Sequence, residues 1–115
     1  MDILILEDNE ERCMHFRKNL INHEVNITEF SKEAISLLEK KDYDILFLDH
    51  DLGGMQMVTS GEGTGYEVAE WLSKNQNRKP KRIYIHSLNE PGRKNMKSVL
   101  PESIEAPFAW LNIVG

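Results

Sequence analysis

The sequence predicts an α/β fold in which helices cover both faces of a parallel sheet, a three-layer, doubly wound sandwich. Three short apolar runs indicate its strands, at Ile3 to Leu6, Ile45 to Leu48 and Ile83 to Ile85. Each run is too short for a helix and is continuously apolar, as in strands that are buried on both faces of a parallel sheet. Segments with helical spacing lie between these runs, and parallel strands require crossovers of that kind, which are nearly always right-handed.

Four helices are expected between and after the strands, each with a residue that can cap its N-terminus. The expected caps are Asn9, Ser31, Thr64 and Asn89, whose side chains can accept a hydrogen bond from the first helical turn. Thr64 and Glu67 also have the spacing of a capping box. A proline in the first turn of the last helix is tolerated, because the N–H groups of that turn have no partner within the helix.

The remaining segments have weaker signals. Val25 to Phe30 is a candidate for a further strand, and Phe108 to Val114 is apolar enough for the last one. The chain ends before another full helix could follow, so we expect the fold to be truncated after the fifth strand. Residues 52–63 are rich in glycine and lack strong periodicity, which predicts a long loop. We expect residues 1–115 to form one domain.

Composition and charge argue against several classes of protein. With 14 Lys and Arg against 19 Asp and Glu, the chain has a net charge of −5 and is a poor candidate for binding duplex DNA. No apolar run approaches the roughly 20 residues that a membrane-spanning helix needs. The N-terminus lacks the basic region of a secretory signal. The lone Cys13 cannot form an internal disulfide, which favours a cytoplasmic location.

Polar residues follow three of the expected strands, where ligands bind in sheets of this kind. They are Glu7 and Asp8 after the first run, Asp49, His50 and Asp51 after the second, and His86, Ser87 and Asn89 after the third. The carboxylates of Glu7, Asp8 and Asp49 can together bind a hard divalent cation, Mg²⁺ or Mn²⁺. A simpler interpretation is that Glu7 and Asp8 favour the N-terminus of the first helix.

Short motifs stand at the ends of these elements: Leu6-Glu7-Asp8-Asn9, Leu48-Asp49, Gly65-Tyr66-Glu67 and Ser87. In this order they resemble the receiver domain of two-component response regulators, which has a flavodoxin-like topology, over the chain up to about Leu100. The resemblance implies that Glu7 and Asp8 bind magnesium, that Asp49 accepts a phosphoryl group, and that Ser87 contacts that group. Receivers also carry a lysine before a proline after the fifth strand, whereas Ala106 precedes Pro107 here.

Two histidines are a further departure from ordinary receivers. His50 follows the acceptor-like Asp49, and His86 precedes Ser87. A more specific resemblance, to the cyclic-phosphate processing receiver-like family, is carried by three segments and three single residues: Leu48 to Gly53, Thr64 to Ala69 and Ile85 to Asn89, with Gly92, Asn95 and Met96. That resemblance implies an enzyme associated with RNA repair that acts on nucleotide-derived cyclic phosphates.

The residues can supply the chemistry that such a reaction needs. Hydrolysis of a cyclic phosphodiester requires an activated water, neutralised phosphoryl charge and a proton for the leaving oxygen, and histidine exchanges protons near neutral pH. We expect His50 and His86 to act as acid and base, and Asp51 to orient His50. Asn89 or Ser87 can donate to a phosphoryl oxygen. Side chains alternate along a strand, so neighbours such as Asp49 and His50 share a pocket only if the chain bends there.

The sequence is therefore consistent with three functions. The first is a metal-assisted phosphoesterase that takes a small nucleotide, a cyclic phosphate or an RNA end. The second is an atypical receiver, a signalling module that accepts phosphate on Asp49. The third is a protein that binds a cyclic nucleotide without cleaving it.

Overall fold

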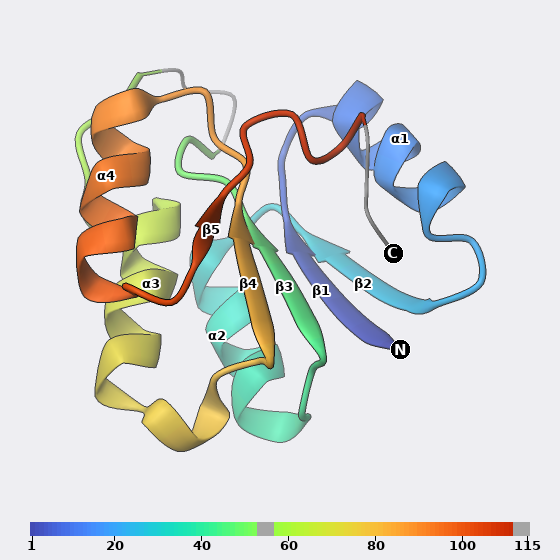
Figure 1. Ribbon diagram of the computed structural model, residues 1–115, viewed down its shortest axis with the longest axis horizontal. Coiled ribbons are helices and arrows are strands. Elements are labelled where there is room, and N and C mark those ends of the chain that lie inside the picture. The colour runs from blue at the N-terminus through green and yellow to red at the C-terminus, as the bar shows by residue number, and fades with distance from the viewer. Residues whose placement is uncertain (53–56, 112–115) are drawn as a thin grey trace.

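The computed structural model describes residues 1–52 and 57–111, which form a five-stranded parallel sheet between two layers of helix (Figure 1). The strands lie in the order β2-β1-β3-β4-β5. They are β1 (Asp2–Leu6), β2 (Glu24–Thr28), β3 (Ile45–Leu48), β4 (Arg82–Ile85) and β5 (Ile104–Glu105). The three strongly predicted strands and the weaker candidate after Val25 are all confirmed, as is the doubly wound α/β class.

Side chains alternate along the strands and so divide the core between the two faces of the sheet. One face is covered by α1 (Glu10–Asn19), where Phe16 and the C-cap residue Leu20 pack in one cluster with Ile3 and Ile5. The other face is covered by α2 (Ser31–Lys40), α3 (Gly65–Lys74) and α4 (Glu90–Val99). A short 3₁₀ turn, η1 (Gln76–Arg78), connects α3 to β4. No helix in the described ranges is long and apolar enough to cross a membrane.

Three of the four predicted caps are confirmed. The side chains of Asn9, Thr64 and Asn89 accept hydrogen bonds from the backbone N–H groups of Arg12, Tyr66 and Gly92, respectively. The prediction for Ser31 is wrong: Phe30 is the N-cap of α2, and Ser31 begins the helix with its hydroxyl donating to Glu67 at 2.6 Å. Glu67 does not complete a capping box, because its carboxylate accepts from the N–H of Gly63 instead of that of Thr64.

The last strand is not where the sequence predicts it. β5 consists of Ile104 and Glu105, and residues 108–111 of the predicted strand form turns; residues 112–114 lie outside the described part of the chain. The N–H of Ala106 completes the pairing with β4, after which the chain turns and Ala109 packs on the α1 face of the sheet. Within the described residues no helix follows β5. Residues 57–63 form neither helix nor strand, as predicted for the loop, and residues 53–56 of it are not described.

Candidate functional site

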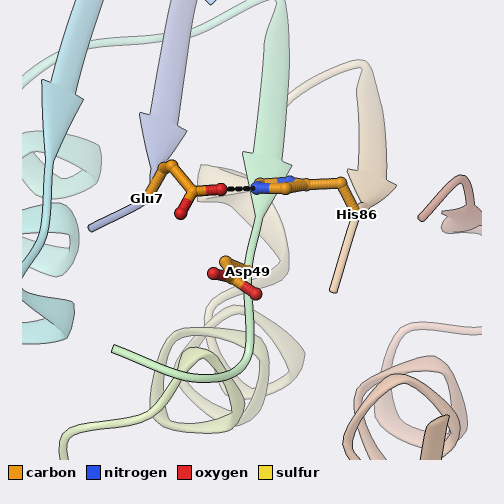
Figure 2. Close-up of side chains that lie close together, drawn as sticks. All are labelled: Glu7, Asp49 and His86. Carbon is orange, nitrogen blue, oxygen red and sulfur yellow. Dashed lines mark hydrogen bonds and ion pairs between the residues drawn. The ribbon is translucent and has the colours of Figure 1, made fainter. Parts of the chain in front are cut away.

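Glu7, Asp49 and His86 each follow a strand directly and lie side by side at the carboxyl edge of the sheet (Figure 2). The strand ladders continue to these residues, because the N–H of Asp49 donates to the carbonyl of Leu6 and that of His86 donates to the carbonyl of Leu48. Residues in register on parallel strands point to the same face. The three side chains therefore converge on the face that α1 covers.

The carboxylate of Glu7 is buried and saturated with hydrogen bonds. His86 Nε2 donates to Oε1 at 2.9 Å, Arg12 donates to both oxygens at 2.9 and 3.1 Å, and the N–H groups of Asp8 and Asn9 donate to Oε2. Burial raises the pKa of Glu7, but the hydrogen bond and charge of His86, followed by those of Arg12, outweigh burial and lower that pKa to about 2. Glu7 is thus an ionised anchor for the guanidinium of Arg12 and the imidazole of His86.

Asp49 has an oxygen without a hydrogen-bond partner. The residue is only 4% exposed; its Oδ1 accepts from the N–H of His50 at 2.8 Å, whereas Oδ2 is buried and accepts none. Arg12 Nη2 lies 3.6 Å from Oδ2, within ion-pair range. Burial raises the pKa of Asp49 to about 7, opposed by the charge of His86 and reinforced by that of Glu7. An open, buried oxygen of this kind is suited to a ligand.

These three residues also have the spacing of a metal site. Glu7, Asp49 and His86 each offer one ligand atom, and the atoms lie within 4.8 Å of one another. Asp49 Oδ2 is free to ligate, whereas Glu7 would have to exchange one of its hydrogen bonds. Of the predicted ligands the structure brings Glu7 and Asp49 together and adds His86; Asp8 lies in the wall of the adjoining pocket.

A pocket of about 760 Å³ opens beside this cluster. Its lining is predominantly acidic, with Arg12 as the one cation among the described lining residues. The lining residues are Asp8, Asn9, Glu10, Arg12, Glu29, Asp49, Asp51, Met57, Ser87 and Leu88. A phosphate ligand would therefore meet more negative charge than one guanidinium can offset, and a bound cation would correct that imbalance.

His50 lies on the opposite face of the sheet from Asp49, as strand alternation predicts. Its imidazole is fully buried, with Nδ1 2.8 Å from Asp51 Oδ1 and Nε2 2.8 Å from Ser60 Oγ. The first turn of α4 closes over the ring, since a Cβ on Gly92 would lie 2.5 Å from its Cγ. The structure thus joins His50 to Asp51, and it does not bring His50 and His86 into one cluster.

The other two predicted phosphoryl donors have different positions. Ser87 lines the pocket, and its Oγ accepts from the N–H of Asn89 at 3.1 Å. The amide of Asn89 is already engaged: Nδ2 donates to Asp51 and to the carbonyl of Val58, and Oδ1 caps α4. In this arrangement Ser87 has a hydroxyl available to a ligand, whereas Asn89 fixes the surrounding loops.

Two residues of these hydrogen-bond networks, Arg12 and Ser60, were not predicted from the sequence. Arg12 stands three residues after the cap of α1, which carries its guanidinium back over the strand end to Glu7 and Asp49. That spacing from Asn9 could have indicated it. Ser60 lies in a loop without periodicity, and no local pattern marks it as a partner of His50.

The chain matches one protein family by sequence and many solved structures by fold. The sequence profile described as "cyclic-phosphate processing receiver domain" matches residues 3–102. No curated protein is significantly similar. Among solved structures, the phosphorylated cyanobacterial phytochrome response regulator RcpA matches with a TM-score of 0.73 and 18% identity, over 99% of this chain and 96% of that one.

Two further response regulators were solved with metal ions. The Mn²⁺-bound form of Rcp1 matches with a TM-score of 0.71 and 16% identity, over 99% of this chain and 96% of its own. TrrA from Thermotoga maritima, in complex with Mg²⁺-BeF, matches with a TM-score of 0.68 and 20% identity, over 90% of this chain and 84% of its own. These similarities show the receiver fold with its flavodoxin-like topology.

Proposed function

Because this chain belongs to the family of cyclic-phosphate processing receiver domains, we propose that it is a metal-assisted phosphoesterase. Its proposed substrate is a cyclic phosphate on a small nucleotide or on an RNA end. The observation that carries the proposal is the unpartnered Oδ2 of Asp49, buried beside the Glu7–His86 pair at the wall of an acidic pocket. A binding oxygen, a histidine proton and space for a ligand are combined there.

A divalent cation, Mg²⁺ or Mn²⁺, is the proposed cofactor. The metal-bound Rcp1 and TrrA structures support it, since both have the same fold. In this chain Asp49 and Glu7 would hold the cation, with Asp8 in the pocket wall, while His86 Nε2 keeps its hydrogen bond to Glu7. When bound, a cation offsets phosphoryl charge and lowers the pKa of a coordinated water.

Arg12 and Ser87 are the proposed phosphoryl-binding side chains. Arg12 lines the pocket while its Nε and Nη2 remain anchored to Glu7, so the guanidinium is held in place before a ligand arrives. Ser87 lies in the same lining and can donate its hydroxyl hydrogen. At the position before Pro107, where receivers carry a lysine, the chain has Ala106, whose methyl group carries no charge. Arg12 therefore supplies the positive charge that the lysine gives to the phosphoryl group in receivers.

His86 is the histidine that the geometry favours for proton transfer at this site. Its Nε2 donates to the ionised Glu7, which keeps a proton next to Asp49. We propose that this proton is delivered to the leaving oxygen of the ester. The imidazole of His50 lies on the other face of the sheet from Asp49, although its partner Asp51 lines the same pocket, so we assign the proton transfer at this site to His86.

The experiment is a turnover assay of the purified chain with Mg²⁺ or Mn²⁺. The panel contains 2′,3′-cyclic nucleotides, 3′,5′-cyclic mononucleotides and ADP-ribose cyclic phosphate, with products followed by ³¹P NMR. We expect hydrolysis of at least one substrate and its loss in Asp49→Asn and His86→Ala. Asp42→Asn, in an exposed residue before β3, is the matched control. Absence of turnover across the panel, or full activity in both site variants, would refute the proposal.

A receiver-type signalling role is the second candidate, favoured by Asp49 and Ser87 lining one pocket in the fold of the phosphorylated RcpA. Acetyl phosphate or beryllofluoride with Mg²⁺ distinguishes the two. A stable adduct on Asp49 without hydrolysis of any cyclic phosphate would support signalling. Tight binding of an intact cyclic nucleotide in isothermal titration would support the third function, sequestration.

A further inference from the structure

Asp51, His50 and Ser60 form a continuous chain of hydrogen bonds on the α4 side of the sheet. Asp51 Oδ1 lies 2.8 Å from His50 Nδ1, and His50 Nε2 lies 2.8 Å from Ser60 Oγ. An acid, an imidazole and a serine hydroxyl are therefore connected through opposite nitrogens of the ring. This is the arrangement that activates serine nucleophiles on unrelated folds.

The surrounding hydrogen bonds determine the direction of the protons. Asp51 accepts from Asn89 Nδ2 at 3.0 Å and from the N–H of Met57 at 2.6 Å, so its carboxylate acts as an acceptor. His50 Nδ1 must then donate to Asp51, which leaves the lone pair on Nε2 for the hydroxyl of Ser60. Asn89 Nδ2 also lies 3.3 Å from His50 Nδ1, but its two amide hydrogens have shorter contacts, at 3.0 Å, with Asp51 Oδ1 and the carbonyl of Val58.

The serine and the imidazole are both held in place. Asn95 Nδ2 donates to Ser60 Oγ at 2.9 Å and fixes the oxygen from the side of α4. The absence of a Cβ at Gly92 lets the helix pack directly against the imidazole of His50. A fixed geometry of this kind is what an activated hydroxyl requires, because misplaced groups lose most of their catalytic effect.

The serine is also accessible, whereas its base is not. Ser60 is partly exposed and His50 is fully buried. A Cβ placed on the neighbouring Gly61 would meet no atom within 4 Å, so the chain next to the serine is not packed against another described segment at that point. A reagent can therefore approach Ser60 from solvent while the imidazole beneath it is shielded.

We propose that Ser60 is an activated nucleophile that accepts a phosphoryl group from a donor whose leaving group departs as an anion, such as an acyl phosphate. The bond from Ser60 Oγ to phosphorus forms as the bond from phosphorus to the leaving oxygen breaks, and the leaving oxygen keeps the electron pair. The hydroxyl proton passes to His50 Nε2, and Asp51 stabilises the resulting imidazolium. Because His50 is shielded from water, the adduct on Ser60 persists.

The test uses a fluorophosphonate ester, which phosphonylates activated serines with loss of fluoride. The full chain is incubated with it, and the adduct is located by intact mass and peptide mapping. We expect labelling of Ser60 and at least about 100-fold slower labelling in Asp51→Asn, the usual size of a general-base contribution. Ser60→Ala abolishes the adduct, and Ser73→Ala, at a partly exposed serine of α3, leaves the rate unchanged.

Labelling of Ser60 no faster than that of Ser73 in the same wild-type molecule would overturn the proposal, and this comparison requires no variant to fold. Labelling of Asp51→Asn at the wild-type rate would overturn it as well. In both cases the hydrogen bonds serve only to tie the loop to α4. The assay contains neither metal nor cyclic phosphate, so its result is independent of the proposed phosphoesterase activity.

Discussion

His86 Nε2 lies 2.9 Å from the carboxylate of Glu7, in a buried hydrogen bond between residues that are 79 positions apart in the sequence. Arg12 completes the charge balance on the solvent side of the same carboxylate. The rings of Phe16 and His86 pack edge to face, with centroids 5.2 Å apart, so the pair is enclosed by the α1 core. A substitution in this pair is therefore expected to change both the stability of the fold and the candidate site.

Replacing Glu7 with glutamine is expected to destabilise the protein strongly. The variant leaves Arg12 and His86 facing an amide, and breaking a buried pair from one side costs about 3 kcal/mol or more. Urea unfolding followed by circular dichroism measures the effect. Glu11→Gln, at a residue of α1 whose side chain is 80% exposed, is the control and should change stability by less than about 0.5 kcal/mol. Equal effects of the two substitutions would contradict the prediction.

The two carboxylates give opposite pH dependences. The pKa of Glu7 is lowered from 4.5 to about 2, so its stabilisation is present above pH 4.5 and is lost as the pH falls through 2. The pKa of Asp49 is raised from 3.8 to about 7, so the stability associated with its protonated form is present below pH 3.8 and is lost as the pH rises through 7.

Asp49→Asn should therefore be more stable than the wild type at pH 8, by on the order of 2 kcal/mol, and nearly equal to it at pH 4. Urea titrations at both pH values, with a chelator present, measure the difference. A variant that is less stable than the wild type at pH 8 would show that the carboxylate of Asp49 is well compensated in the folded state.

Mn²⁺ is expected to raise the midpoint of thermal unfolding of the wild type. A ligand at 100 times its dissociation constant stabilises the native state by about 2.7 kcal/mol. Asp49→Asn replaces the ligand oxygen that has no hydrogen-bond partner, so the shift should disappear. Differential scanning fluorimetry with and without EDTA tests this, with Asp42→Asn keeping the full shift. An undiminished shift in Asp49→Asn would place the metal elsewhere.

Gly92→Ala should destabilise the protein although alanine favours helices. The new Cβ would lie 2.5 to 2.8 Å from three atoms of the His50 ring, which is held by hydrogen bonds at both nitrogens and cannot move aside. Overpacking of this kind costs about 1–3 kcal/mol, more than the gain in helix propensity. Gly61→Ala, where the Cβ meets open space, is the matched control. Similar midpoints in urea for both variants would disprove the clash.

The elements of the fold were largely predictable because their signals are local. Continuously apolar runs indicated β1, β3 and β4, and the polar residues Asn9, Thr64 and Asn89 indicated helix starts. The errors have a non-local cause. Ser31 bonds to Glu67, 36 residues away, instead of capping α2, and β5 is defined by pairing with β4 and not by its own apolarity.

For the site, the sequence by itself determined which residues stand at the strand ends: Glu7, Asp49 and His86, with His50 next to Asp49. Only the tertiary structure decided their partners. Parallel register directs Glu7, Asp49 and His86 to one face, while the alternation that places His50 on the other face joins it to a loop serine and to α4. Strand periodicity is encoded locally, but the residue that faces a side chain depends on the packing of distant segments.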